Sequence, residues 1–412
     1  MSASDRDLSE LIHDWNTLEE IPGPRRGHVE LDDETLRDGL QNPSVQDPEL
    51  EDKKRLLHLM NDLGIDSASL GLPGAGPKAF EHVKALCEEI RDQKLNVTAN
   101  CAGRTMVQDA EPMVRITQET GVPIEACLFI GSSPIRQFVE SWTVNEILKR
   151  STEAVSYAAG EGLPVMYVTE DTTRADPETI RRLYTAAVEA GARRVCVCDT
   201  VGHSTPRGAF AVTKFVREVV DATGEEVKVD WHGHRDRGLA VANCLAAIEA
   251  GADRVHGCGI GIGERVGNAE IELLLVNLML LGWSDRDLSK LPEYCEAVSR
   301  AVEAPIPRNL PIVGDDAFET ATGVHAAAVI KAAEKGSDWL ADRVYSGVPA
   351  GSIGRRQVIK VGIMSGRSNV AWWLRENGHE VTDDRVAAIL AAAKQSRSNL
   401  TDEELERLVS AS

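Results

Sequence analysis

Along most of the chain, short apolar segments alternate with longer segments in which apolar residues recur every three to four positions. The short segments are typical of buried strands, and the longer ones are typical of amphipathic helices. The predicted strands are 28–31, 67–72, 95–100, 125–130, 164–169, 194–198, 227–231 and 254–258. The helices predicted to follow them are 49–63, 77–92, 108–120, 145–159, 177–190, 207–222, 239–250 and 268–281.

Eight consecutive strand–helix units predict an α/β fold, a closed (β/α)8 TIM barrel, which typically needs about 250 residues. A doubly wound open sheet is the alternative. The first predicted strand is not followed by a Gly-x-Gly-x-x-Gly turn, which favours the barrel over a dinucleotide-binding sheet.

We expect three parts in the chain. Residues 1–25 form an N-terminal helix and a linker that contains Ile21-Pro-Gly-Pro24, and residues 26–300 form the TIM-barrel catalytic domain. Residues 301–412 form a helical C-terminal region, with a helical stretch at 317–335 and a Gly- and Arg-rich loop at 346–368. No further sheet module is expected there.

Charge and cysteine usage narrow the classes of function. The chain has 412 residues and a formal net charge of −20, which argues against binding to nucleic acids or to anionic membranes. Its 8 cysteines lie in apolar patterns, not in zinc-finger spacing, so we expect free buried thiols. The N-terminus shows no apolar signal segment, and no apolar run is long enough to span a membrane. We therefore expect a cytoplasmic protein.

Charged and amide side chains gather where the predicted strands end, which is where barrel enzymes build their sites. The candidates are Arg37, Asp38 and Gln41 after the first strand, Arg104 after the third, Glu170 after the fifth, Thr200 after the sixth, His232 and His234 at the seventh, and Gly261, Gly263, Glu264 and Asn268 after the eighth.

The two histidines are the strongest sign of a metal. Alternate side chains of a strand face the same side, so His232 and His234 are aimed at one point. Taken alone, the pair fits a metal site and a purely structural role equally well; in the structural role one His packs within the strand and the other caps the next helix. With one carboxylate and one amide oxygen nearby, it predicts a site for one divalent ion, Zn, Mn, Mg or Co, that polarises a carbonyl. The Gly-rich segment 257–267 leads into a helix, where exposed amides suit a phosphate or carboxylate.

Four segments in this order resemble the DRE-TIM metallolyases: Glu34-Thr-Leu-Arg-Asp-Gly39, Asp199-Thr-Val-Gly202, His232-Gly-His234 and Gly261-Ile-Gly-Glu-Arg-Val-Gly-Asn268. The chain is similar to the Claisen-condensing branch of that superfamily, the 2-isopropylmalate, citramalate and homocitrate synthases. The likeness covers roughly residues 26 to 370. It includes Thr322-Gly-Val-His325, Tyr345 and Gly354-Arg355 in the helical region.

The resemblance implies residue roles. The implied metal ligands are Asp38, His232, His234 and Asn268. The implied catalytic residues are Arg37 for the developing oxyanion, Glu170 and His325 for the proton transfers, and Tyr345. The implied substrate contacts are Thr200 to the carboxylate of a 2-oxo acid, Glu264 with Gly261 and Gly263 to acetyl-CoA, and Gln41 and Arg104.

The resemblance also implies an acyltransferase reaction and an assembly. Acetyl-CoA would condense with a 2-oxo acid to give a 2-alkylmalate and CoA. A homodimer is implied, in which the helical region contributes to the active site of the other subunit. The chain ends near where the leucine-sensing domain of the family would begin, so we expect that domain to be lacking.

The chain departs from the 2-isopropylmalate synthase pattern at positions that bear on the oxo acid. It has Ser69 in place of a strand-2 Glu, Cys127 in place of a strand-4 His, and Arg136 in place of a His after Ser-Pro. With Cys196 and Cys198 on the sixth strand, we expect an apolar pocket for 2-oxoisovalerate or a bulkier apolar 2-oxo acid. Arg136 is expected to point outward, because an inward Arg136 would favour a second carboxylate or a phosphonate.

Several alternatives remain open at this point. Within the branch they are homocitrate, citramalate and phosphonomethylmalate synthases. A retro-Claisen enzyme such as hydroxymethylglutaryl-CoA lyase also carries an Asp-Gly-Leu-Gln-Asn segment like the one at 38–42. A non-catalytic metal-binding barrel that acts as a scaffold or sensor is the alternative from another class.

Overall fold

The computed structural model describes residues 8–17 and 23–411, which belong to two compact units. The barrel unit spans Glu20–Pro305, and the C-terminal unit combines Ile306–Ser412 with the N-terminal residues up to Glu19. Of the predicted N-terminal helix and linker, residues 1–7 and 18–22 lie outside the described residues. The described part forms two short 3-10 turns, Leu8–Leu11 and Trp15–Thr17.

The barrel unit is a closed ring of parallel strands, which confirms the predicted (β/α)8 TIM barrel. The strands pair in sequence order, and the last pairs with the first. Their bounds are β1 Glu30–Asp33, β2 Ser67–Ser69, β3 Thr98–Arg104, β4 Glu125–Gly131, β5 Val165–Glu170, β6 Arg194–Asp199, β7 Lys228–Gly233 and β8 Arg254–Gly257.

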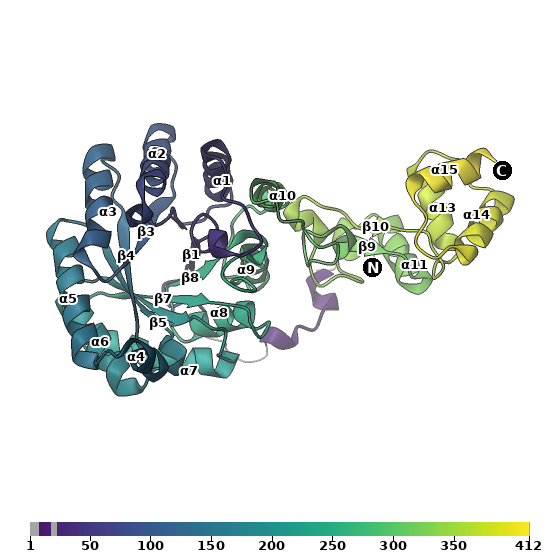
Figure 1. Ribbon diagram of the computed structural model, residues 1–412. Helices are drawn as coiled ribbons and strands as arrows, with labels where there is room; N and C mark the ends of the chain where they lie inside the picture. The colour runs from purple at the N-terminus through teal and green to yellow at the C-terminus, as the bar shows by residue number, and fades with distance from the viewer. Residues whose placement is uncertain (1–7, 18–22, 412) are drawn as a thin grey trace. The chain divides into compact units, whose positions relative to one another are not determined.

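Helices surround the strands, as Figure 1 shows, and cover the outward-facing apolar side chains. They are α1 Leu50–Asp62, α2 Pro77–Gln93, α3 Val107–Thr120, α4 Pro134–Glu140, α5 Val144–Gly160, α6 Pro177–Glu189, α7 Pro206–Asp221, α8 Ala240–Glu249, α9 Ile271–Leu280 and α10 Leu291–Ala301. Helix α4 was not predicted. It starts at Pro134 after the capping hydroxyl of Ser133, and it is too short to show a helical period.

Inward-facing side chains fill the barrel in layers of different chemistry. The N-terminal ends of the strands hold a buried ionic network in which Arg194 and Arg254 bind carboxylates of Glu30, Glu125 and Asp230. Above it lie apolar and thiol side chains. Four of them form one buried cluster: Cys127, Met166, Cys196 and Cys198. This floor network fills the interior at the N-terminal ends of the strands.

The C-terminal unit is mainly helical. Its elements are β9 Glu319–Thr320, α11 Gly323–Glu334, α12 Asp338–Ala341, β10 Val358–Ile359, α13 Arg367–Glu376, α14 Asp383–Gln395 and α15 Asp402–Ser410. The predicted helix at 317–335 begins only at Gly323, because Glu319–Thr320 pair instead as a strand with Val358–Ile359. This pair is a small sheet that the sequence did not predict. No helix within the described ranges is both long and apolar enough to cross a lipid bilayer.

Candidate active site

A cavity of about 280 Å³ opens among the C-terminal ends of the strands. Charged and polar groups occupy part of its lining and apolar side chains the rest. Its polar lining consists of Glu34, Arg37, Asp38, Gln41, Glu170, Thr200, His232, His234, His256, Glu264 and Arg265. Its remaining lining consists of Leu72, Ala102, Cys127, Phe129, Met166, Val168, Cys196 and Cys198.

The two predicted histidine ligands face one point. Their Nε2 atoms lie 3.1 Å apart, and Oδ2 of Asp38 lies 3.8 Å from Nε2 of His232. Burial, together with the neighbouring His232, lowers the pKa of His234 to about 4, so His234 is neutral at pH 7. Neutral imidazoles and a carboxylate are the form in which these groups bind a divalent ion.

Asn268 completes the predicted ligand set. Its Nδ2 donates to Oδ1 of Asp38 at 2.9 Å, while its Oδ1 is buried and has no hydrogen-bond partner among the described residues. A buried amide oxygen without a partner is costly unless an ion or a water satisfies it. The donor set of two imidazoles, one carboxylate and one amide oxygen therefore fits a divalent metal.

Close backbone packing holds Asn268 in place. Gly263 has φ +145°, and a Cβ built there would lie 2.1 Å from Nδ2 of Asn268. Only glycine leaves room for the amide at this point. The Gly263 carbonyl also accepts a hydrogen bond from Nδ2 of Asn42, which ties the segment after β8 to the segment after β1.

Arg37 lies beside the ligand set. Its Nη1 donates to Oδ2 of Asp38 at 2.9 Å, its Nε donates to the Ser69 hydroxyl at 3.3 Å, and its Nη2 pairs with Oε1 of Glu34. Burial opposes the charge on Arg37, but the carboxylates of Glu34 and Asp38 outweigh it and raise the pKa, so the guanidinium stays charged.

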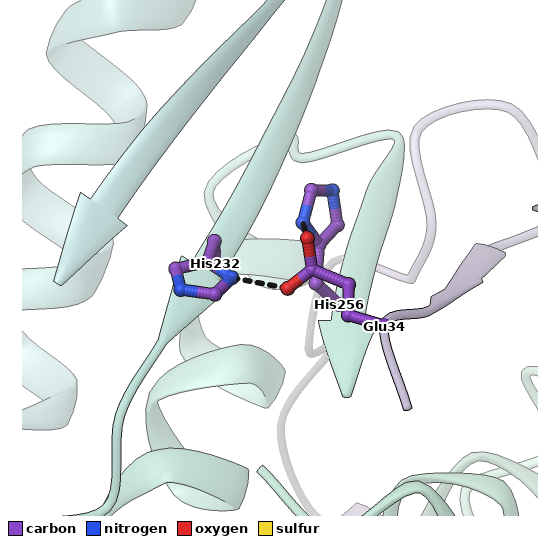
Figure 2. Close-up of side chains that lie close together, drawn as sticks. All are labelled: Glu34, His232 and His256. Atoms are coloured by element: carbon purple, nitrogen blue, oxygen red, sulfur yellow. Dashed lines mark ion pairs between the residues drawn. The ribbon is translucent and has the colours of Figure 1, made fainter. Parts of the chain in front are cut away.

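Three polar residues of the cavity lining were missed as candidates by the sequence analysis: Glu34, His256 and Arg265. Glu34 appeared only as the first letter of a motif, and His256 was counted as a strand residue. Glu34 lies two positions after inward-facing Asp32, and His256 lies two positions after inward-facing Arg254. Because alternate strand residues face the same side, this spacing could have identified both. Figure 2 shows the carboxylate of Glu34 between the rings of His232 and His256.

Glu170 ends β5 at the rim of the cavity. Burial raises its pKa, and the nearby Arg136 guanidinium only partly offsets this. Nη2 of Arg136 lies 3.9 Å from Oε2 of Glu170, and Nη1 pairs with Glu140 at 3.0 Å. The Arg136 side chain was expected to point outward. It does not line the cavity, but its guanidinium faces Glu170, which does.

Some of the remaining candidates line the cavity and others do not. Thr200, Gln41 and Glu264 line the cavity, and the Thr200 hydroxyl accepts from the Asp171 amide at 2.8 Å. Arg104 does not line it: its side chain is largely exposed and pairs with Asp109. Gly261 is also absent from the lining, and a Cβ there would meet Nη1 of Arg235 at 2.7 Å.

The candidates His325 and Tyr345 belong to the C-terminal unit. Their rings stack with centroids 4.2 Å apart and an interplanar angle of 26°. Both side chains are exposed, and so are the neighbouring Val324, Ile363 and Met364. The two residues thus form one exposed aromatic pair within this unit.

Comparison with known proteins gives consistent results. A family model described as HMGL-like matches residues 28–298. A probable 2-isopropylmalate synthase of Methanopyrus kandleri is 35% identical over 89% of this chain and 69% of its own length. The homocitrate synthase AksA of the same organism is 32% identical over 92% of this chain and 90% of its own. Among solved structures, the HMG-CoA lyase of Bacillus subtilis superimposes with a TM-score of 0.58 at 22% identity, covering 69% of this chain and 97% of the lyase, which shows a shared fold.

Proposed function

Because the chain belongs to the HMGL-like family of DRE-TIM enzymes, we propose that it condenses acetyl-CoA with an apolar 2-oxo acid such as 2-oxoisovalerate. The products are a 2-alkylmalate and free CoA. The observation that carries this proposal is the convergence of Asp38, His232 and His234 beside Arg37 in a cavity that also has an apolar wall, with Asn268 hydrogen-bonded to Asp38 behind it. Relatives named as condensing synthases over about nine-tenths of this chain support it.

The residues of the cavity suit the steps of such a condensation. Asp38, His232, His234 and Asn268 would hold a divalent metal, which when bound supplies a Lewis acid for the carbonyl of the oxo acid. Glu170 accepts a proton from the methyl group of acetyl-CoA, since burial makes this carboxylate a stronger base. The carbanion carbon then bonds to the carbonyl carbon. Arg37 donates hydrogen bonds to the oxygen that becomes negatively charged.

The cavity residues also suit the binding of the two substrates and the release of CoA. The Thr200 hydroxyl, at the cavity surface, binds the carboxylate of the oxo acid, and Gln41 and Glu264 at the rim face acetyl-CoA. Water then cleaves the thioester, which leaves a carboxylate on the product and a thiol on CoA. The proton removed at the start returns to the alkoxide. The hydrolysis releases one net proton, because the new carboxylic acid ionises.

The apolar wall supports an uncharged side chain on the oxo acid. Cys127, Met166, Cys196 and Cys198 form it, and none of these side chains carries a charge when buried. A distal carboxylate placed against this wall would be buried without a partner, which is costly. An alkyl side chain instead removes apolar surface from water.

A second candidate is a synthase for a dianionic oxo acid, favoured by one observation. Arg136 carries a guanidinium 3.9 Å from Glu170 at the rim. If the Arg136 side chain released Glu140 and Glu170, its guanidinium could instead bind a second carboxylate or a phosphonate on the substrate.

We propose that the active form is a homodimer in which the helical region of each chain supplies His325 and Tyr345 to the barrel of the other. The exposed aromatic pair and the exposed apolar side chains of Val324, Ile363 and Met364 support a surface that is covered in an assembly. Mixing inactive Arg37→Ala and inactive His325→Ala proteins should restore part of the activity. Mixtures that stay inactive while forming heterodimers would contradict the shared site.

The 8 cysteines are free and buried, which supports a reducing compartment, and we propose that the enzyme works in the cytoplasm.

The decisive experiment is a CoA-release assay with a panel of oxo acids. The metal-loaded protein is incubated with acetyl-CoA and 2-oxoisovalerate, pyruvate, phenylpyruvate, 2-oxoglutarate or phosphonopyruvate, and the free thiol is measured. We expect oxo-acid-dependent release that is abolished in Arg37→Ala. No release with any oxo acid, together with cleavage of hydroxymethylglutaryl-CoA, would overturn the proposal in favour of a lyase.

A further inference from the structure

The Glu34 carboxylate, which is not among the predicted ligands, contacts both the predicted catalytic arginine and a predicted metal ligand. Its Oε1 pairs with Nη2 of Arg37, and its Oε2 lies 2.6 Å from Nδ1 of His232. The side chain is only 5% exposed, and it stands at the wall of the cavity directly after β1. Glu34 therefore constrains two functional side chains at once.

The contact with His232 decides which ring nitrogen carries the proton. A carboxylate only accepts hydrogen bonds and repels a nitrogen lone pair, so the 2.6 Å contact favours a proton on Nδ1 of His232, although the two atoms are not aligned as a regular hydrogen bond. A proton on Nδ1 leaves the lone pair on Nε2, the atom that faces His234 and Asp38. Partners of this kind fix the tautomer and orientation of metal-bound histidines.

His256 supports Glu34 from the interior of the barrel. Its Nε2 lies 2.9 Å from Oδ2 of Asp230, and its Nδ1 lies 3.5 Å from Oε1 of Glu34. The ring is 2% exposed, and Asp230, which holds it, is itself fixed by Arg194 and Arg254. The floor network thus reaches Glu34 through His256. Figure 2 shows Glu34 between the rings of His256 and His232.

We propose that Glu34 and His256 are positioning residues of the active site. Glu34 holds the Nε2 lone pair of His232 toward the metal and the guanidinium of Arg37 toward the substrate, and His256 fixes Glu34 against the floor network. This inference rests on the metal-dependent function proposed above, but its test reads metal binding, which needs no turnover.

The test compares Zn²⁺ affinity in substituted full-length proteins, measured by competition with a chromogenic chelator. Glu34→Gln keeps the shape of the side chain but can present an NH₂ group to Nδ1 of His232, which favours the wrong tautomer. We expect affinity to fall about 10- to 100-fold, the range found for such partners. The matched control is Glu89→Gln on α2, another glutamate paired with a histidine, since its Oε1 lies 2.8 Å from Nε2 of His58 outside the cavity lining; its affinity should stay within about twofold.

A second substitution separates positioning from simple packing. Glu34→Asp shortens the side chain but keeps an acceptor-only carboxylate, so it should lose less Zn²⁺ affinity than Glu34→Gln. The visible spectrum of the Co²⁺-loaded proteins should follow the same order, with the aspartate variant closer to the unsubstituted protein. A packing role predicts the reverse order, because glutamine is the closer fit in shape. That reverse order, or unchanged affinity in Glu34→Gln, would overturn the proposal.

The role of His256 is tested by a double substitution. If His256 acts through Glu34, His256→Gln weakens Zn²⁺ binding alone, but adds little when combined with Glu34→Gln. Fully additive losses would overturn this part, and so would binding of two Zn²⁺ ions per chain, which would make Glu34 and His256 ligands themselves. Far-UV circular dichroism and thermal unfolding of each variant show whether it is folded, and Glu34→Asp keeps the test valid if Glu34→Gln fails to fold.

If no oxo acid releases CoA while the variants behave as expected, the proposed condensation fails and the positioning roles stand.

Discussion

The Nε2 atoms of His232 and His234 lie 3.1 Å apart at the end of β7, and both rings are buried. Two ring nitrogens at this distance are stable only if one donates a hydrogen bond to the other or if both lone pairs bind a cation. The adjacent carboxylate of Asp38 and the unpaired amide oxygen of Asn268 favour the cation. This relationship is the reason for expecting metal dependence.

Removal of one imidazole or of the carboxylate from the ligand set should therefore abolish metal binding without unfolding the barrel. We expect His232→Ala and Asp38→Ala to lose the bound divalent ion and at least about 100-fold in kcat, because Lewis-acid catalysis is worth several kcal/mol. Metal content by atomic spectroscopy and far-UV circular dichroism check this. Full metal occupancy in both variants would contradict the assignment.

A substitution that adds one methyl group beside Asn268 should have a similar effect. In Gly263→Ala the new Cβ would lie 2.1 Å from Nδ2 of Asn268, so the amide must move and metal affinity should fall at least about tenfold. The control is Gly378→Ala, also at positive φ but with no atom within 4 Å of its Cβ. Both variants should lose about 1 kcal/mol of stability from the left-handed backbone, but only the first should lose metal. Equal metal affinities in the two variants would show that Asn268 is not a ligand.

The pH dependence of activity should report on Glu170. Burial raises its pKa and Arg136 lowers it, so the acid limb of kcat/KM should lie above the ordinary value of 4.5 for a glutamate. In Arg136→Ala the lowering influence is lost, and the limb should move to higher pH. A limb that shifts to lower pH, or that persists in Glu170→Gln with full activity, would rule out Glu170 as the base.

Strand alternation predicted that His232 and His234 face one point, and the family resemblance added Asp38 and Asn268 as expected ligands. The structure brings these four residues together. The same alternation also placed Cys127, Cys196 and Cys198 on the inner face, where they line the cavity.

Other features depend on contacts between distant segments and left no local pattern. Arg104 ends β3, but Asp109, five residues later, binds its guanidinium, and Arg104 does not line the cavity. The floor network joins Glu125, Arg194 and Arg254 from three strands, and each residue alone reads as an ordinary strand terminus. Glu319–Thr320 pairs with residues nearly 40 positions later, so its two-residue strand could not be separated from the helix that follows.

Stability should also depend on pH through Glu272 at the start of α9. Its side chain is fully buried, which raises the pKa to about 8, and its Oε2 accepts a hydrogen bond from the amide of Ile260, whose φ is +51°. Because the folded pKa exceeds the unfolded one, the folded state binds more protons between about pH 4.5 and 8, and the stability contribution is lost as the pH rises across this window.

In Glu272→Gln this loss should disappear, since glutamine stays neutral. The midpoint of thermal unfolding should fall less between pH 5 and 8 than in the unsubstituted protein. The control is Glu296→Gln, whose side chain is 62% exposed and which should keep the original slope. The same slope in all three proteins would show that Glu272 does not titrate in this range.

The last prediction concerns the side chain of the oxo acid. The apolar wall of Cys127, Met166, Cys196 and Cys198, with Val168 packed against it, should accept alkyl or aryl groups. We expect kcat/KM for 2-oxoisovalerate or phenylpyruvate to exceed that for 2-oxoglutarate. Differences among alkyl groups should be shallow, because one methylene is worth about 1–3 kcal/mol in such a pocket. Val168→Phe fills part of the cavity of about 280 Å³, so it should lower kcat/KM for phenylpyruvate more than for pyruvate.

The matched control is Val139→Phe on α4, where the side chain is 68% exposed and lies outside the cavity lining, and it should leave the ratio unchanged. Arg136→Ala provides the opposing test. If 2-oxoglutarate or phosphonopyruvate is the preferred substrate, and if Arg136→Ala removes that preference, then Arg136 leaves Glu170 to bind the second anionic group. The apolar wall would in that case surround only the carbon chain of a dianionic substrate, and the alkyl specificity proposed here would be wrong.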